Sequence, residues 1–101
     1  MASRLELQSK LEELLGTRNV YYQPPESIKM RYTAIRYSKS SYYIAHANNS
    51  IYSKLTRYEV VVIAQSPDDP VIDKILELPY CAFGQHYVAE NLYHDVFTLY
   101  Y

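Results

Sequence analysis

Three residues with reactive side chains, Cys81, His86 and His94, lie close together near the C-terminal end of the sequence. A cysteine with a histidine base beside it is the arrangement of a thiol nucleophile, and such a base is held in place by a third group. The spacing shows no obvious third group, so a buried, unreactive thiol is the favoured interpretation of Cys81. We therefore expect no catalytic residue here and no enzyme.

A second set of side chains, His86, Glu90, His94 and Asp95, offers nitrogen and oxygen ligands for a metal ion. If two strands run on either side of a turn at 89–91, the two histidines would face one another. The spacing matches no standard metal site, and hydrogen-bonded or solvated side chains explain the set more simply. We expect neither a metal nor another cofactor.

The charged residues do not predict a binding site for nucleic acid. The acidic residues Asp68, Asp69 and Asp73 lie where a helix is expected to start, and negative charge there favours the helix dipole. Basic residues near the first two expected strands are Arg31, Arg36, Lys39, Lys54 and Arg57. They are spread out and interleaved with Glu59 and tyrosines, and the net charge is -1. We therefore expect no specific nucleic-acid binding.

Length and composition predict one globular domain, 1–101. The chain is 49% hydrophobic and 21% charged, and no run approaches the roughly 18 apolar residues of a membrane span. We expect a soluble protein without a membrane partner or an export signal. A single cysteine suits a reducing cytoplasm. The 13 tyrosines are unusual, and tyrosine is favoured at protein contacts.

The N-terminal half predicts a helix and a strand joined by a connector. A Ser-x-x-Glu capping box, leucines at helical spacing and then Gly16 predict a helix over 4–15. Adjacent prolines make 17–29 an extended connector. The sequence MRYTAIRYS predicts a first strand at about 30–38. The next segment, about 38–54, is rich in Ser and Asn with aromatics between them, so we expect a long loop or loose hairpin there.

The second half predicts a central strand, a helix and a final hairpin. The β-branched block Val60–Ile63 is typical of a strand covered on both faces, at the centre of a sheet. A helix follows within 66–79, capped by Ser66 or Asp69. Two strands then flank a short turn at 89–91. The order α-β-β-α-β-β indicates an α+β fold, with two helices packed on one face of a four-stranded, mainly antiparallel sheet.

The last expected strand ends on Tyr100 and Tyr101. Alternation places Tyr93, Asp95, Phe97, Leu99 and Tyr101 on one face, and His94, Val96, Thr98 and Tyr100 on the other. Both faces are largely apolar, as expected if the strand lies inside the sheet or if its outer face meets another molecule. A domain this small is not expected to bury both terminal tyrosines fully, so they are candidate contact residues.

Residues 57–101 resemble the C-terminal half of small tail-completion proteins encoded in the tail-assembly regions of tailed bacteriophages and prophages. The shared features are a central strand, a Pro-Asp start to the helix, a hairpin of the pattern LP.C.F...YVA.NL.HDVF.LYY and an aromatic ending. The matching residues are Arg57, Tyr58, Pro67, Asp68, Leu78, Pro79, Cys81, Phe83, Tyr87, Val88, Ala89, Asn91, Leu92, His94, Asp95, Val96, Phe97, Leu99, Tyr100 and Tyr101. The first half matches more loosely, through MRYTAIRYS and YIAHANNSIY.

The resemblance implies a tail terminator, a structural protein of α+β fold. Such a protein forms a ring, expected to be a hexamer, that caps the head-proximal end of the tail tube and joins the tail to the head. The implied partners are other copies of the chain, the major tail tube protein and the head-to-tail connector proteins. The implied location is the tail or neck of the virion, assembled in the cytoplasm of the bacterial host.

In this interpretation the 38–54 segment reaches the tube or the adjacent subunit. Its candidate contact residues are Tyr42, Tyr43, Ile44 and Tyr52. A closed ring needs two different patches on each subunit, and tyrosines supply amphipathic contact area. Two other classes stay open. One is a head-tail connector or adaptor of the same particle. The other is a small regulatory, nucleic-acid-binding α+β domain, which would bind DNA in a salt-dependent way.

Overall fold

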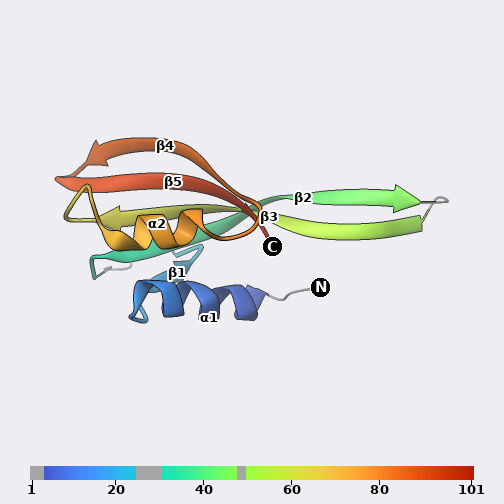
Figure 1. The fold of residues 1–101 in the computed structure, drawn as a ribbon, viewed down its shortest axis with the longest axis horizontal. Coiled ribbons are helices and arrows are strands. Elements are labelled where there is room, and N and C mark those ends of the chain that lie inside the picture. The colour runs from blue at the N-terminus through green and yellow to red at the C-terminus, as the bar shows by residue number, and fades with distance from the viewer. Residues whose placement is uncertain (1–3, 25–30, 48–49) are drawn as a thin grey trace.

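The chain folds into a mixed five-stranded sheet with two helices on one face (Figure 1). The computed structural model describes residues 4–24, 31–47 and 50–101, and for 43–47 and 50–55 it describes the backbone alone. The elements are α1 (Arg4–Leu15), β1 (Val20–Tyr22), β2 (Ala34–Ala47), β3 (Ser50–Ala64), α2 (Pro70–Leu76), β4 (Cys81–Ala89) and β5 (Leu92–Tyr100). The predicted α+β class is confirmed.

The strands lie side by side in the order β1-β2-β3-β5-β4. β1 runs parallel to β2, and every other neighbouring pair is antiparallel. β3 is therefore the central strand, as the β-branched block predicted. Its residues Val60–Ile63 are at most 3% exposed.

The predicted four-stranded sheet and its order α-β-β-α-β-β were wrong, because Val20–Tyr22 form an additional strand. The observed order is α-β-β-β-α-β-β. We expected this part of the chain, within 17–29, to be an extended connector. With three residues, β1 is too short to show a period, and it is held by parallel pairing with Ile35–Tyr37, a partner that local sequence does not reveal.

The helix α1 has the predicted bounds, and Gly16 ends it as expected. Gly16 has a φ of +84°, and its amide donates a 2.9 Å hydrogen bond to the Glu12 carbonyl oxygen. Glycine adopts this left-handed conformation without steric cost, which closes the helix. Ser3, the serine of the expected capping box, lies outside the described residues. In the described part of the chain, no helix is long and apolar enough to cross a membrane.

The helix α2 is shorter than the segment predicted for it and is capped by Asp69. The Asp69 carboxylate accepts a 3.0 Å hydrogen bond from the Val71 amide, and Pro70 occupies the first turn, where no amide donor is needed. Ser66, the other predicted cap, instead accepts a bond from the Asp68 amide. Asp69 also accepts a 3.1 Å bond from the Thr33 hydroxyl, which ties the start of α2 to the chain just before β2.

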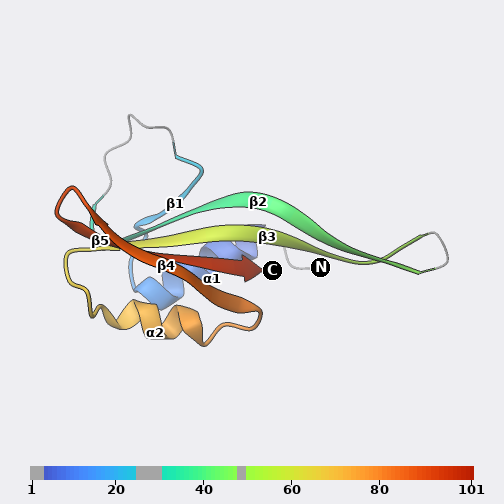
Figure 2. The same ribbon diagram turned by 90° about the horizontal axis from the view of Figure 1, so that it is seen from above.

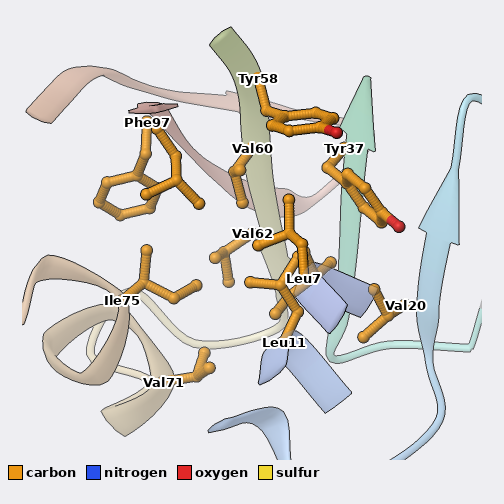
Figure 3. Packing of buried hydrophobic residues seen from close by; sticks show 12 residues of the cluster. Leu7, Leu11, Val20, Tyr37, Tyr58, Val60, Val62, Val71, Ile75 and Phe97 are labelled. Carbon is orange, nitrogen blue, oxygen red and sulfur yellow. The ribbon is translucent and has the colours of Figure 1, made fainter. Parts of the chain in front are cut away.

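The hydrophobic core lies between the helices and one face of the sheet, as Figure 3 shows. Its buried residues are Leu7, Leu11, Val20, Ile35, Tyr37, Tyr58, Val60, Val62, Val71, Ile75, Phe97 and Leu99. The predicted alternation in the last strand is confirmed, since Phe97 and Leu99 both point into this core. Full burial of one such aliphatic or aromatic side chain contributes about 1.5–3 kcal/mol.

The strands β4 and β5 form the predicted hairpin. Glu90 and Asn91 make the turn, and both have positive φ angles, of 53° and 65°. Two such residues match the twist of an antiparallel pair, and this is the usual short hairpin turn.

The strands β2 and β3 are much longer than predicted. Residues 38–54, expected to be a long loop or loose hairpin, belong to these two strands apart from 48–49, which lie outside the described residues. The paired ends of the two strands extend well beyond the rest of the molecule (Figures 1 and 2). They give the molecule a long axis of 51 Å, against 25 and 23 Å across. We call residues 41–47 and 50–55 the arm, and the remainder the body.

Candidate interaction surface

The arm is a two-stranded ribbon that the other strands do not accompany. The pairing of β1 with β2 ends at Tyr37. On the other side β5 pairs with β3 as far as Arg57, and Tyr101 exchanges backbone hydrogen bonds with Thr56, of 3.0 and 3.2 Å. Beyond Thr56, β2 and β3 pair only with one another among the described residues.

A two-stranded ribbon without a neighbouring strand or helix has little stability of its own. Two antiparallel strands without a third strand or a helix are marginally stable in water, and each outer edge carries a row of unpaired amides and carbonyls. At about 3.3 Å for each residue, the seven residues 41–47 span roughly 23 Å. That reach is comparable to the 25 Å width of the molecule. The arm is therefore long enough to lie across a second molecule of this size.

A row of tyrosines holds the root of the arm rigidly on the body. The rings of Tyr22, Tyr37 and Tyr58 lie side by side on β1, β2 and β3, with centroid distances of 4.9 and 5.8 Å. The Arg4 guanidinium of α1 sits 4.5 Å above the ring of Tyr22. Its Nη1 also donates a 3.2 Å hydrogen bond to the Tyr37 hydroxyl. These contacts fix where the arm leaves the body.

The Tyr37 hydroxyl is fully engaged within this root. It donates a hydrogen bond to the Gln8 side-chain oxygen while it accepts the one from Arg4. Burial raises the pKa of Tyr37 above its usual value, and the hydrogen bond from Arg4 partly opposes that shift. The phenol therefore stays neutral at ordinary pH, as a structural group of the root.

Tyr42 is the predicted contact residue at the start of the arm, next to its root. It is 46% exposed at the start of the arm. The Lys39 ammonium donates a 2.8 Å hydrogen bond to its hydroxyl and lies 5.1 Å from its ring centroid. This hydrogen bond is the largest cause of a raised pKa at Lys39. Tyr42 therefore presents an aromatic ring beside a fixed positive charge.

The other three candidates in this segment occupy defined positions along the arm. Tyr43 pairs with Leu55, and Ile44 pairs with Lys54. Tyr52 is the extra residue of an irregularity in β3, because the register passes from Ser53 to Ile51 across from consecutive residues of β2. The predicted contact residues of the 38–54 segment thus all lie on the arm, with Tyr42, Tyr43 and Ile44 paired in its ladder and Tyr52 at the irregularity.

Tyr100 and Tyr101 lie at the root of the arm and are both half-buried. Tyr100 is paired with Arg57, and its amide donates a 3.1 Å hydrogen bond to the Tyr80 carbonyl oxygen. Tyr101 packs against the core and lines a shallow hollow with residues of α1. Since Thr56 pairs with both Tyr42 and Tyr101, the structure brings a predicted arm residue and a predicted terminal residue to one place.

Sequence reasoning missed a second exposed feature, the outer edge of β4. Every residue from Ala82 to Val88 is exposed, including Phe83 at 51%, Tyr87 at 37% and Val88 at 59%. β4 is the last strand of the sheet, so no other described strand pairs with its outer edge. The signal in the sequence was the absence of Lys, Arg, Asp, Glu and Pro from Cys81 to Ala89.

The histidines do not face one another as the metal hypothesis required. His86 is paired with Asp95, and its Nδ1 lies 2.8 Å from the Asp95 Oδ1. His94 is paired with Tyr87 and stacks on its ring at 4.6 Å, on the other face of the sheet. Among the described residues, no group of at least three His, Cys, Asp or Glu side chains is placed to hold a metal ion.

Cys81 shows no sign of an activated thiol. It is half-buried against the core, and burial raises the pKa of its thiol. The thiolate is the nucleophilic form, so this shift works against reactivity. His86, the nearer histidine in sequence, is engaged with Asp95.

No protein-family model matches the chain, and no curated protein matches it.

Proposed function

We propose that this chain is a structural subunit of a phage or prophage tail that caps the head-proximal end of the tail tube as a ring, expected to be a hexamer, and joins the tail to the head. The observation that carries the proposal is the arm, a long ribbon that projects from the body and has no other described strand paired with it (Figure 1). The resemblance of residues 57–101 to tail-completion proteins is the reason for proposing a phage tail as the assembly.

The arrangement of the surfaces supports a ring. A ring is closed by a heterologous interface, in which two different patches of each subunit meet. This chain carries two different candidate patches, the arm at one end and the exposed β4 edge on the body. Tyrosine is enriched at protein interfaces, and Tyr42 and Tyr101 adjoin the root of the arm.

The overall charge suits a ring through which DNA passes. A net charge of -1 provides no general attraction for phosphates, so DNA would not be retained by the lining. In this proposal the partners are other copies of the chain, the major tail tube protein and the connector proteins of the head. The protein acts in the tail or neck of the virion after assembly in the host cytoplasm, without catalysis.

The direct test is to disrupt this gene in the phage or prophage that carries it and to examine the particles by negative-stain electron microscopy. We expect overlong, headless tails of variable length beside DNA-filled heads. Expression of the wild-type chain in trans should restore normal particles. Normal virions after disruption alone would contradict the proposal. A connector or adaptor role would instead leave tails of normal length that do not join heads.

One observation favours a different class, a DNA-binding domain. Every charged side chain between residues 31 and 57 is basic, and this range includes the whole arm. Two-stranded ribbons can enter DNA grooves. That alternative predicts binding to duplex DNA with an affinity that falls steeply as salt rises. Titration of labelled duplex DNA at two salt concentrations tests it, and the tail proposal predicts no binding at physiological salt.

A further inference from the structure

We propose that the arm of one copy of this chain adds as a strand to the free β4 edge of the next copy, so that the sheet continues across the subunit boundary. The inference rests on the proposed function for its ring. The contact itself is a property of the purified protein and can be measured without a phage.

The two edge strands of the described sheet differ, and β4 is the one better suited to pair with an added strand. β1 at one edge has only three residues, and short edge strands are one way in which proteins prevent pairing with another chain. β4 at the other edge has nine residues and no Lys, Arg, Asp, Glu or Pro. Its one irregularity is at Gly84, which leaves Gln85–Ala89 regularly paired with β5, and the first four of these residues are exposed.

Among the described residues, the arm has unpaired backbone hydrogen-bonding groups, and the outer edge of β4 can pair with them. Its two strands have no third strand and no helix against them, so its backbone edges are unpaired in the described chain. The seven residues 41–47 are long enough to cover all of Gln85–Ala89. Pairing the two surfaces satisfies backbone groups on both and covers the side chains of Tyr87 and Val88, which are otherwise exposed.

The charges favour this contact over a symmetric one. The charge of the arm is positive, because Lys54 is the only Lys, Arg, Asp or Glu within 41–47 and 50–55. The region around β4 is acidic. From residue 66 onward the acidic residues are Asp68, Asp69, Asp73, Glu77, Glu90 and Asp95, and the only Lys or Arg is Lys74. α2, which carries Asp73, packs beside β4, and Glu90 forms the turn that ends it.

Two β4 edges paired with one another would bring these acidic regions together, and two paired arms would bring the basic regions together. Pairing of an arm with a β4 edge brings opposite charges together. Such complementarity favours this contact over the symmetric ones and raises the association rate. Because arm and edge are different patches, each copy can use both at once, which is the requirement for a ring.

Two variants each remove one side of the proposed contact, the arm or the β4 edge. In the armless variant, residues 43–55 are replaced by Asn-Gly, which closes the hairpin at the existing Tyr42 and Thr56 pair. In the edge variant, Gln85→Lys and Val88→Lys add positive charge at two exposed positions of β4. Leu5→Lys is the matched control, because Leu5 is an exposed apolar residue, at 65%, on α1. Circular dichroism and denaturation first establish that each variant is folded.

The experiment measures association of the purified chains by analytical ultracentrifugation. We expect the wild type and Leu5→Lys to self-associate, and each test variant alone to associate about tenfold more weakly or not at all. Mixed together, the armless and edge variants should form a one-to-one complex, because the edge variant still offers an arm and the armless variant still offers an edge. Raised salt should weaken this complex.

The contrary results are equally specific. No complex in the mixture, or an edge variant that self-associates like the wild type, overturns the proposal. Self-association that strengthens with salt and needs no arm would indicate edge-to-edge pairing instead. A wild-type chain that stays monomeric up to about 1 mM also overturns it. These outcomes are independent of the tail role, since disruption of the gene can give overlong tails whether or not the arm meets β4.

Discussion

In the body, β2 and β3 lie between β1 and β5 and form part of the core that α1 covers. In the arm, the described parts of the same two strands pair only with one another. The body residues of these strands are among the most buried of the molecule, with Ile35, Tyr37, Val60 and Val62 at 0% exposure. In the arm, Tyr42 is 46% exposed. One continuous pair of strands thus passes from a buried core to a ribbon with no other described strand beside it. We propose that the body determines folding and that the arm serves association.

The largest effect on folding should come from the body. Leu11→Ala removes a fully buried leucine of α1 and leaves a cavity, so we expect a loss of about 2–5 kcal/mol in the free energy of unfolding. Leu5→Ala in the same helix is the matched control, because Leu5 is 65% exposed and should change the stability little. Urea denaturation of both variants measures the difference. Equal losses would mean that the packing of α1 is not as described.

The terminal tyrosines lie at the boundary between body and arm. Deletion of Tyr100 and Tyr101 removes the two backbone bonds to Thr56, the bond from the Tyr100 amide to the Tyr80 carbonyl oxygen, and the packing of Tyr101 on the core. At about 0.5–1.5 kcal/mol for each hydrogen bond, we expect a loss of roughly 1.5–4.5 kcal/mol in the unfolding free energy, with a folded chain remaining. Denaturation and ultracentrifugation together distinguish the roles. Collapse of folding would make these residues core alone, while loss of association in a stable chain would make them contacts.

Removal of the N-cap of α2 should lower the stability by a smaller amount, and the effect should be confined to the body. Asp69→Ala removes the acceptor for the Val71 amide and the Thr33 hydroxyl, so a loss of about 1 kcal/mol is expected. Asp68→Ala is the control, since Asp68 is exposed and does not cap the helix. Thermal unfolding measures both. Self-association should be unchanged by either substitution, within the accuracy of ultracentrifugation.

The smallest effect on folding is expected in the arm. Tyr42→Ala combined with Tyr43→Ala should change the unfolding free energy by less than about 0.5 kcal/mol, because both positions lie on the arm, where β2 and β3 pair only with one another among the described residues. Self-association and tail assembly should nevertheless weaken. Tyr42→Phe keeps the ring without the hydroxyl and serves as the matched variant. Unchanged tail assembly in the double variant would remove these tyrosines from the mechanism.

Local sequence was sufficient for elements whose pattern repeats over many residues. The leucines of α1 and the alternation of Phe97 and Leu99 each recur along one face, the β-branched block of β3 is a continuous run buried on both faces, and the structure confirms all of them. The turn at Glu90 and Asn91 was also predicted in place. In these segments burial of one face or of both determines the conformation, so the pattern of apolar residues can be recognised from the sequence.

The elements that depend on distant partners could not be predicted in this way. β1 exists because Val20–Tyr22 meet β2, and three residues contain no period. Residues 38–54 were not recognised as parts of two strands. Their composition is rich in Ser and Asn, and irregularities at Ser40 and Tyr52 interrupt the alternation expected of a strand. The predicted contact residues were nevertheless placed on the arm and at its root. The β4 edge was missed, because its exposure follows from the order of strands in the sheet.

The central claim, that the arm serves assembly and not folding, is tested most directly in the phage or prophage itself. In cells whose own copy of the gene is disrupted, the variant with residues 43–55 replaced by Asn-Gly is supplied in trans, and the tails are measured by negative-stain electron microscopy. We predict overlong, headless tails although the variant is folded, and normal particles when the wild-type chain is supplied. Normal virions assembled with the armless variant would contradict this account.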